Sequence, residues 1–206
     1  MTAILKVDTI QDTAGNNIIN ESSDTITIGA SGDTVNVIGT LQSNGSAVPT
    51  VAGGITNAQQ WRLSANLTGD AEPIAANWEE ADTDGYNRLG DAMTQSSGVF
   101  TFPATGYWLI IFMFTHQAGG SDSKYNTGVI QTATNGSSFG SASESYNNLY
   151  GSGVYSGNSV NFVFDVTNTS THKVRFMSSV EENATVLQGD SGNNRTSATF
   201  IRLGDT

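Results

Sequence analysis

The clearest hydrophobic pattern in the chain lies between residues 98 and 114. In its first part, Phe100 and Phe102 point to one face and the residues between them to the other, which is typical of a half-buried β-strand. Pro103 cannot donate a hydrogen bond to a strand ladder, and Gly106 permits a turn. The chain is therefore predicted to reverse its direction here and to begin a second strand.

From Tyr107 to Phe114 the alternation stops, and eight consecutive residues are apolar or aromatic. Trp, Ile and Phe favour a strand over a helix, and the run is too short for a transmembrane helix, which needs roughly 20 apolar residues.

A strand that is apolar on both faces must be covered on both. We expect one face to lie against a second sheet of the same domain. No helical layer is evident in the sequence, so we expect another copy of the chain on the other face; the alternative is the central strand of a monomeric sandwich. The candidates for this subunit interface are Tyr107, Trp108, Ile110, Phe112 and Phe114.

Other segments predict an all-β fold with many short strands. Residues 160–166 and 172–176 both alternate between apolar and polar positions, and the turn at Asn168 between them indicates a hairpin. Glycine is abundant, with 23 residues, and proline is scarce, with three, so we expect frequent turns and no long helices.

The first 60 residues contain none of the eighteen aromatic residues, so this part must be built differently from the rest. It holds short β-branched runs, and residues 24–29 repeat in residues 33–39 at an offset of nine. The thirteen Ile, Leu and Val side chains of residues 1–50 cannot offset the conformational entropy of ordering the segment alone. It is therefore either disordered until it docks or intertwined with copies of itself. We predict a thin three-chain β-prism or shaft over residues 1–41, a linker over 42–57 and a head domain over 58–206.

Composition excludes several kinds of chemistry. The net charge of −11 argues against nucleic-acid binding, which needs clustered Lys and Arg. There is no cysteine for disulfides or thiolate metal sites, and the two histidines, His116 and His172, are isolated from any triad motif. Carboxylates in residues 82–85 and at Asp190 resemble calcium-loop ligands, but the pattern is incomplete, and we expect solvated turns. We predict no catalytic residue, no cofactor and no metal site.

Residues 135–158 have the composition of a binding surface, with tyrosines among Ser, Gly and Asn. Tyrosine supplies a large contact area at low entropic cost, and small polar residues adapt to a ligand. The alternative is that the tyrosines of edge strands pack against a neighbouring subunit. The candidate receptor-binding residues are Tyr146, Asn147, Asn148, Tyr150 and Tyr155.

The run GVFTFPATGYWL, residues 98–109, resembles the strand pair that opens onto an aromatic strand in C1q-like domains. The closing run SATFIRLG, residues 197–204, resembles the last strand of that family but lacks the glycine after Phe200. The similarity covers roughly residues 58–206, and the segments around Trp61 and Trp78 look more like bacteriophage C1q-like domains than animal ones. This resemblance implies a jelly-roll sandwich of the C1q/TNF type that forms a homotrimer with the aromatic strand buried at its axis.

The resemblance also implies a function. The opening residues 5–16 are similar to the N-termini of phage fibre and structural proteins. We therefore expect a bacteriophage tail fibre or spike whose N-terminal segment attaches to other virion proteins. Its head would bind a glycan or protein of the host cell surface. The alternatives are a purely structural virion component, such as a capsid decoration or tail adaptor, and a polysaccharide depolymerase.

The N-terminus has no basic region followed by a long apolar run, so it does not resemble a secretory signal. We expect the protein to be made in the host cytoplasm, to insert into no membrane and to leave the cell as part of the virion.

Overall fold

The computed structural model describes residues 54–206 throughout. In the N-terminal part it describes residues 9–11, 13–14, 17–22, 25–28, 32, 34–35, 42–43 and 46–47. The chain divides into two compact units, Met1–Ala52 and Gly53–Thr206. Most of the predicted shaft lies outside the described residues. The same is true of residues 42–53 of the predicted linker, apart from residues 42, 43, 46 and 47.

The N-terminal unit contains a small antiparallel sheet in the order β1-β2-β3. Its strands are β1 (Thr9–Gln11), β2 (Asn17–Ser22) and β3 (Thr25–Ile28), and a separate pair is formed by β4 (Gln42–Ser43) and β5 (Ser46–Ala47). Ile10 pairs with Ile19, and Ile19 pairs with Ile28, so three isoleucines spaced nine residues apart form one row across the sheet. They are 40%, 37% and 56% exposed, so this row is not covered by the chain itself. We call it the isoleucine ladder.

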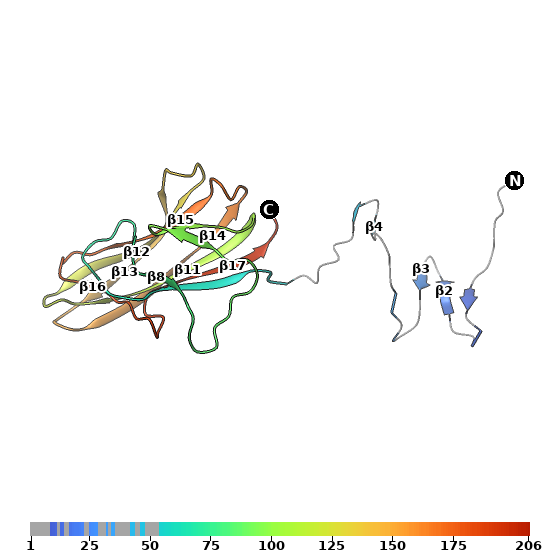
Figure 1. Ribbon diagram of the computed structural model, residues 1–206, viewed down its shortest axis with the longest axis horizontal. Coiled ribbons are helices and arrows are strands. Elements are labelled where there is room, and N and C mark those ends of the chain that lie inside the picture. Colours follow the sequence, from blue (N-terminus) through green and yellow to red (C-terminus); the bar gives the residue numbers. More distant parts are fainter. Residues whose placement is uncertain are drawn as a thin grey trace. The chain divides into compact units, whose positions relative to one another are not determined.

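The C-terminal unit is a sandwich of two antiparallel sheets, and residues 54–206 contain no helix (Figure 1). The first sheet has the order β7-β16-β11-β17-β6-β8, with β14 paired to the other edge of β11. Its strands are β6 (Ala58–Leu63), β7 (Leu67–Thr68), β8 (Trp78–Glu80), β11 (Gly106–Gln117), β14 (Tyr155–Val166), β16 (Val186–Leu187) and β17 (Ser197–Gly204). The second sheet has the order β13-β12-β15-β10-β9. Its strands are β9 (Thr94–Ser96), β10 (Val99–Thr101), β12 (Ser123–Ala133), β13 (Gly140–Leu149) and β15 (Lys173–Ser179). The predicted all-β fold is confirmed.

The predicted hairpin between residues 160–166 and 172–176 is wrong. β14 pairs with β11 in the first sheet, whereas β15 pairs with β12 and β10 in the second. The turn at Asn168 therefore carries the chain from one sheet to the other. The alternation was read correctly, because both strands are half-buried, but their apolar faces meet across the sandwich instead of lying side by side.

The core is an aromatic layer between the two sheets. On β11 the even-numbered residues point inward, and Phe112 lies 4.7 Å from Phe176 of β15 between ring centroids. Phe100 of β10 lies 5.5 Å from Phe176 and 5.3 Å from Phe200 of β17. These rings meet edge-on or tilted, as aromatic side chains prefer.

This packing corrects most of the predicted subunit interface. Trp108, Ile110, Phe112 and Phe114 are at most 1% exposed and belong to the core of the protomer. Their side chains are covered by the second sheet of the same chain, so they are not available to another subunit. Among the five candidates only Tyr107, which is 42% exposed, points away from the core.

Close contact between the sheets requires a glycine on β12. A Cβ at Gly128 would lie 2.2 Å from ring atoms of Phe114. Because Phe114 is fully buried, its ring has little room to move.

We predict that Gly128→Ala lowers the free energy of unfolding by about 1–3 kcal/mol through overpacking, measured by urea denaturation. A second substitution, Phe114→Leu, should recover part of the loss. Gly140→Ala is the control, because nothing lies within 4 Å of a Cβ there; equal losses for the two glycines would contradict the contact.

A buried histidine makes the stability of the head depend on pH. His116 is fully buried, and its ring nitrogens lie 3.3 Å from Asn147 Oδ1 and 2.9 Å from Ser178 Oγ. Burial lowers the pKa of His116 to about 4 from 6.5. Between these values the unfolded chain binds a proton that the folded chain does not, so stability falls as pH decreases from 6.5 to about 4 and is unaffected by this group above 6.5.

We therefore predict that the free energy of unfolding contains a pH-dependent part of up to ~3 kcal/mol from this histidine. Urea denaturation of the wild type and of His116→Gln at several pH values measures it. The advantage of the wild type over His116→Gln should shrink from pH 7 to pH 4, and parallel profiles would contradict the prediction.

Candidate functional site

The outward side of β11 forms an apolar surface with its neighbouring strands. Odd-numbered residues point outward, and Leu109 pairs with Val163 of β14 on one side and with Ile201 of β17 on the other. Val163 is 51% exposed. This outer face consists of Tyr107, Leu109, Ile111, Met113, Val163, Ile201 and Leu203. An exposed apolar surface spread over three adjacent strands is typical of an interaction site.

A carboxylate at the border of the outer face has an unsatisfied atom. Asp165 pairs with Tyr107 in the strand register, and its Oδ1 is buried without a hydrogen-bond partner among the residues that the structure describes. Buried polar atoms are nearly always hydrogen-bonded. A donor from outside the protomer would satisfy this atom.

The tyrosines predicted to bind a receptor are exposed. Tyr146 on β13 is 56% exposed, and Tyr150 and Tyr155 are each 60% exposed. The hydroxyl of Tyr146 donates to Glu144 Oε1 at 3.0 Å, and this hydrogen bond to a carboxylate raises the pKa of Tyr146. Tyr125 on the adjacent strand β12 is also 60% exposed. Sequence reasoning missed Tyr125 because it considered only the tyrosine-rich segment.

Of the two neighbouring asparagines, Asn148 is exposed and Asn147 is not. Asn147 is 8% exposed, accepts from His116 Nδ1 through Oδ1, and donates from Nδ2 to the Ser156 carbonyl at 2.9 Å. Its position as a receptor contact is therefore wrong: it ties β13 to β11 and β14 inside the sandwich. The alternation of strand faces, with Tyr146 outward and Asn147 inward, was the signal that could have shown this.

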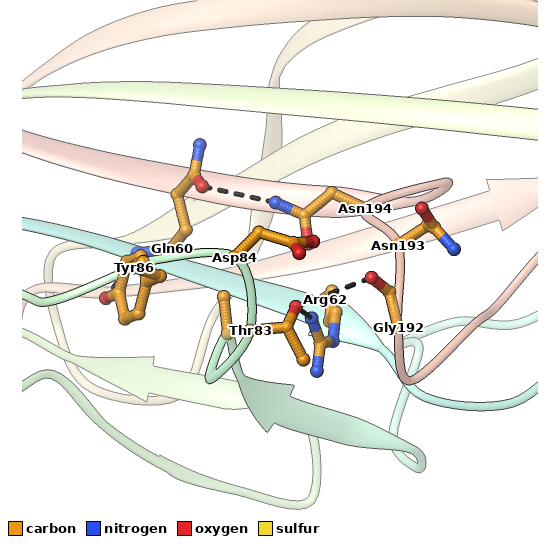
Figure 2. Close-up of a pocket in the computed structure, with 10 residues that line it drawn as sticks. Gln60, Arg62, Thr83, Asp84, Tyr86, Gly192, Asn193 and Asn194 are labelled. Carbon is orange, nitrogen blue, oxygen red and sulfur yellow. Dashed lines mark hydrogen bonds between the residues drawn. The ribbon is translucent and has the colours of Figure 1, made fainter.

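A polar pocket lies beside β6, between the loop of residues 81–86 and the loop of residues 192–194 (Figure 2). Arg62 is one of the residues that line it and is only 1% exposed. Its Nε donates to Glu79 Oε1 at 2.8 Å, Nη1 to Thr83 Oγ1 at 2.9 Å, and Nη2 to Asp82 Oδ1. The guanidinium therefore fixes the first loop to the strand.

Two of the three carboxylates that resembled calcium ligands, Asp82 and Asp190, have other partners. Asp82 is engaged by Arg62. Asp190 Oδ1 accepts from the backbone N–H of Gly192 at 2.8 Å and of Asn193 at 3.1 Å, and Oδ2 lies 3.0 Å from Arg195 Nη2. The Gly192 hydrogen bond, together with Asn193 and the charge of Arg195, lowers the pKa of Asp190. Among the described residues, no three His, Asp or Glu side chains gather as metal ligands would.

In the part of the chain that the structure describes, no helix is long and apolar enough to cross a membrane.

Comparison with known proteins adds the class of fold. No protein-family model matches the sequence, and no curated protein matches it. The crystal structure of murine APRIL at pH 5.0 is similar, with a TM-score of 0.52, 10% identity, and coverage of 71% of this chain and 98% of that one. The structure of Eiger TNF from S. frugiperda matches with a TM-score of 0.48 and 13% identity, covering 72% of this chain and 93% of that one. The match to APRIL shows that the head is a jelly roll of the C1q/TNF type, and an identity this low shows the fold alone.

The buried guanidinium leads to a prediction. Replacing Arg62 by Met removes three hydrogen bonds and leaves Glu79 and Asp82 partly reachable by water, since these side chains are 33% and 74% exposed. We predict a loss of about 1–3 kcal/mol in the free energy of unfolding and faster amide exchange in residues 82–86. Arg88→Met is the control, because Arg88 is 42% exposed in its ion pair with Glu80 and such pairs contribute under about 1 kcal/mol. Equal effects in the two variants would contradict this role of Arg62.

Proposed function

We propose that the protein is a homotrimeric bacteriophage fibre or spike whose jelly-roll head binds a receptor on the host cell. The observation that carries the proposal is the outer face on β14, β11 and β17. Its seven side chains are large and apolar, and no part of residues 54–206 covers them fully. The resemblance to C1q-like domains supports three copies as the assembly that covers this face.

The geometry of the outer face suits contact between identical chains. Six of its seven residues lie on β11 and β17, whose backbone groups are paired on both sides, so side chains make the contact there. Depletion of charge in the centre is typical of subunit interfaces. The unsatisfied Asp165 Oδ1 at its border is a further group that a neighbouring copy would satisfy.

The isoleucine ladder supports a shaft built from several chains. A three-stranded sheet with an exposed row of isoleucines needs a partner surface, and its own chain offers none among the described residues. Copies of the same ladder packed around a common axis would cover each other. We propose that this shaft joins the head to other virion proteins, and that the protein acts in the virion by binding, without catalysis.

Receptor binding is proposed for the surface that carries Tyr146, Asn148, Tyr150 and Tyr155. Their exposure leaves the rings free for a ligand. A trimer presents each contact three times, so weak individual contacts combine into strong attachment.

The assembly is tested by the mass of the full chain in solution, measured by light scattering. We expect about three times the chain mass of 21.6 kDa. Val163→Asp places a charge on the outer face beside Leu109 and should reduce the mass to that of one chain, because an unpaired buried charge is costly. Tyr125→Asp is the matched control: it is similarly exposed but lies on the other sheet, and should leave the mass unchanged. A monomeric wild type, or a trimeric Val163→Asp, would contradict the proposal.

The receptor function is tested by adsorption blocking. Excess purified protein should protect host cells from infection if the head is an adhesin, whereas a purely structural virion component should give no protection. Tyr146→Ala combined with Tyr150→Ala should weaken the protection and retain the trimer mass.

A further inference from the structure

The polar pocket beside β6 is separate from the exposed tyrosines and has no part in the function proposed so far. Its volume is about 380 Å³, within the range of small-molecule sites. From its lining we infer that it binds one saccharide ring of a surface glycan. This inference rests on the proposed adhesive function and assigns to it a site and a chemical class of ligand.

Gln60, Tyr86 and Asn194 of the pocket are held in place by hydrogen bonds within the protein. Gln60 donates from Nε2 to Thr199 Oγ1 at 3.0 Å, and its Oε1 accepts from Asn194 Nδ2 at 3.1 Å (Figure 2). Tyr86 accepts from the Gln60 backbone N–H at 3.1 Å and donates to Glu80 Oε1 at 3.2 Å. A ligand therefore meets groups that are already ordered, which lowers the entropic cost of binding.

Several polar atoms at the pocket retain capacity for a ligand. Among the described residues, the carboxylate of Asp84 and the amide oxygen of Asn194 accept no hydrogen bond, and both residues line the pocket (Figure 2). Arg62 has five N–H groups, of which three are used. Acceptors and donors thus stand close together. A sugar hydroxyl both donates and accepts, so adjacent hydroxyls of a saccharide match this set.

Other classes of ligand fit the lining less well. A phosphate would find a single guanidinium, already paired with Glu79 and Asp82, and would be repelled by Asp84. A divalent cation would find one uncommitted carboxylate, since Asp82 and Asp190 are engaged. An apolar ligand would leave the buried polar groups unpaired. The ring of Tyr86 offers one apolar surface, which suits the C–H face of a sugar.

The position of the pocket agrees with use in a multivalent head. Gln60 pairs with Thr199, and Thr199 pairs with Ile111 of the outer face, so the pocket adjoins that face on the same side of the sheet. A trimer assembled through the outer face would carry three equivalent pockets. Low affinity for one sugar ring would then be sufficient for attachment.

The experiment uses the full chain and saturation-transfer NMR with the methyl glycosides of glucose, galactose, mannose and N-acetylglucosamine as probes. We expect at least one glycoside to receive magnetisation from the protein. The affinity of the protein for that glycoside should fall at least tenfold in Asp84→Asn and in Asn194→Ala. Asparagine tolerates the positive φ of 56° at position 84, so the first substitution keeps the backbone conformation. Asp91→Asn and Asn87→Ala are the matched controls, because both residues are exposed, lie near the first loop and do not line the pocket; they should bind as the wild type does.

Each other outcome overturns the inference. If no glycoside binds, the pocket has been assigned the wrong class of ligand. If a glycoside binds equally well to the pocket variants but not to Tyr146→Ala, the sugar site lies on the tyrosine surface. Light scattering and adsorption blocking on the same preparations distinguish failure of the pocket inference from failure of the proposed function. A trimer that protects cells without using the pocket refutes the pocket inference alone. A monomer that gives no protection refutes the adhesive trimer.

Discussion

The packing of the inward side chains of β11 against the second sheet determines most of what the head can do. Phe112 contacts Phe176, and Phe114 occupies the space that Gly128 leaves open on β12. Because side chains alternate along a strand, a shift of one residue would exchange the two faces of β11. The aromatic contacts therefore fix both the core and the identity of the residues that face outward.

The same constraint separates three surfaces with different chemistry. The outer face occupies the opposite side of the strands that build the core, and there the outward positions are apolar as well. The exposed tyrosines lie on β12, β13, β14 and the turn between the last two, and beneath Tyr146 the buried Asn147 of β13 contacts His116 of β11. The pocket lies at the other edge of the first sheet, where Arg62 replaces apolar packing by ion pairs. Proposed assembly and proposed binding thus use different parts of one sandwich.

The fold could largely be predicted from the sequence, whereas the site could not. The apolar run from Tyr107 to Phe114 predicted a central strand correctly, but periodicity within a continuous apolar run cannot tell which face is inside. The bulky rings at the even positions, against Leu109 and Ile111 at the odd ones, were the available signal. The false hairpin between β14 and β15 has a similar cause, since alternation reports half-burial and not the partner strand. The pocket combines Gln60, Asp84 and Asn194 from three distant segments, and no local pattern brings them together.

The isoleucine ladder sets a unit of length. Each step from one strand to the next takes nine residues and returns an isoleucine to the same row, and neighbouring strands lie about 4.8 Å apart. Inserting or deleting whole units of nine would widen or narrow this sheet in fixed steps and leave the isoleucine row continuous. A change of any other size would interrupt that row. The extent of this sheet can therefore change in steps of one strand while the fold of the head remains the same.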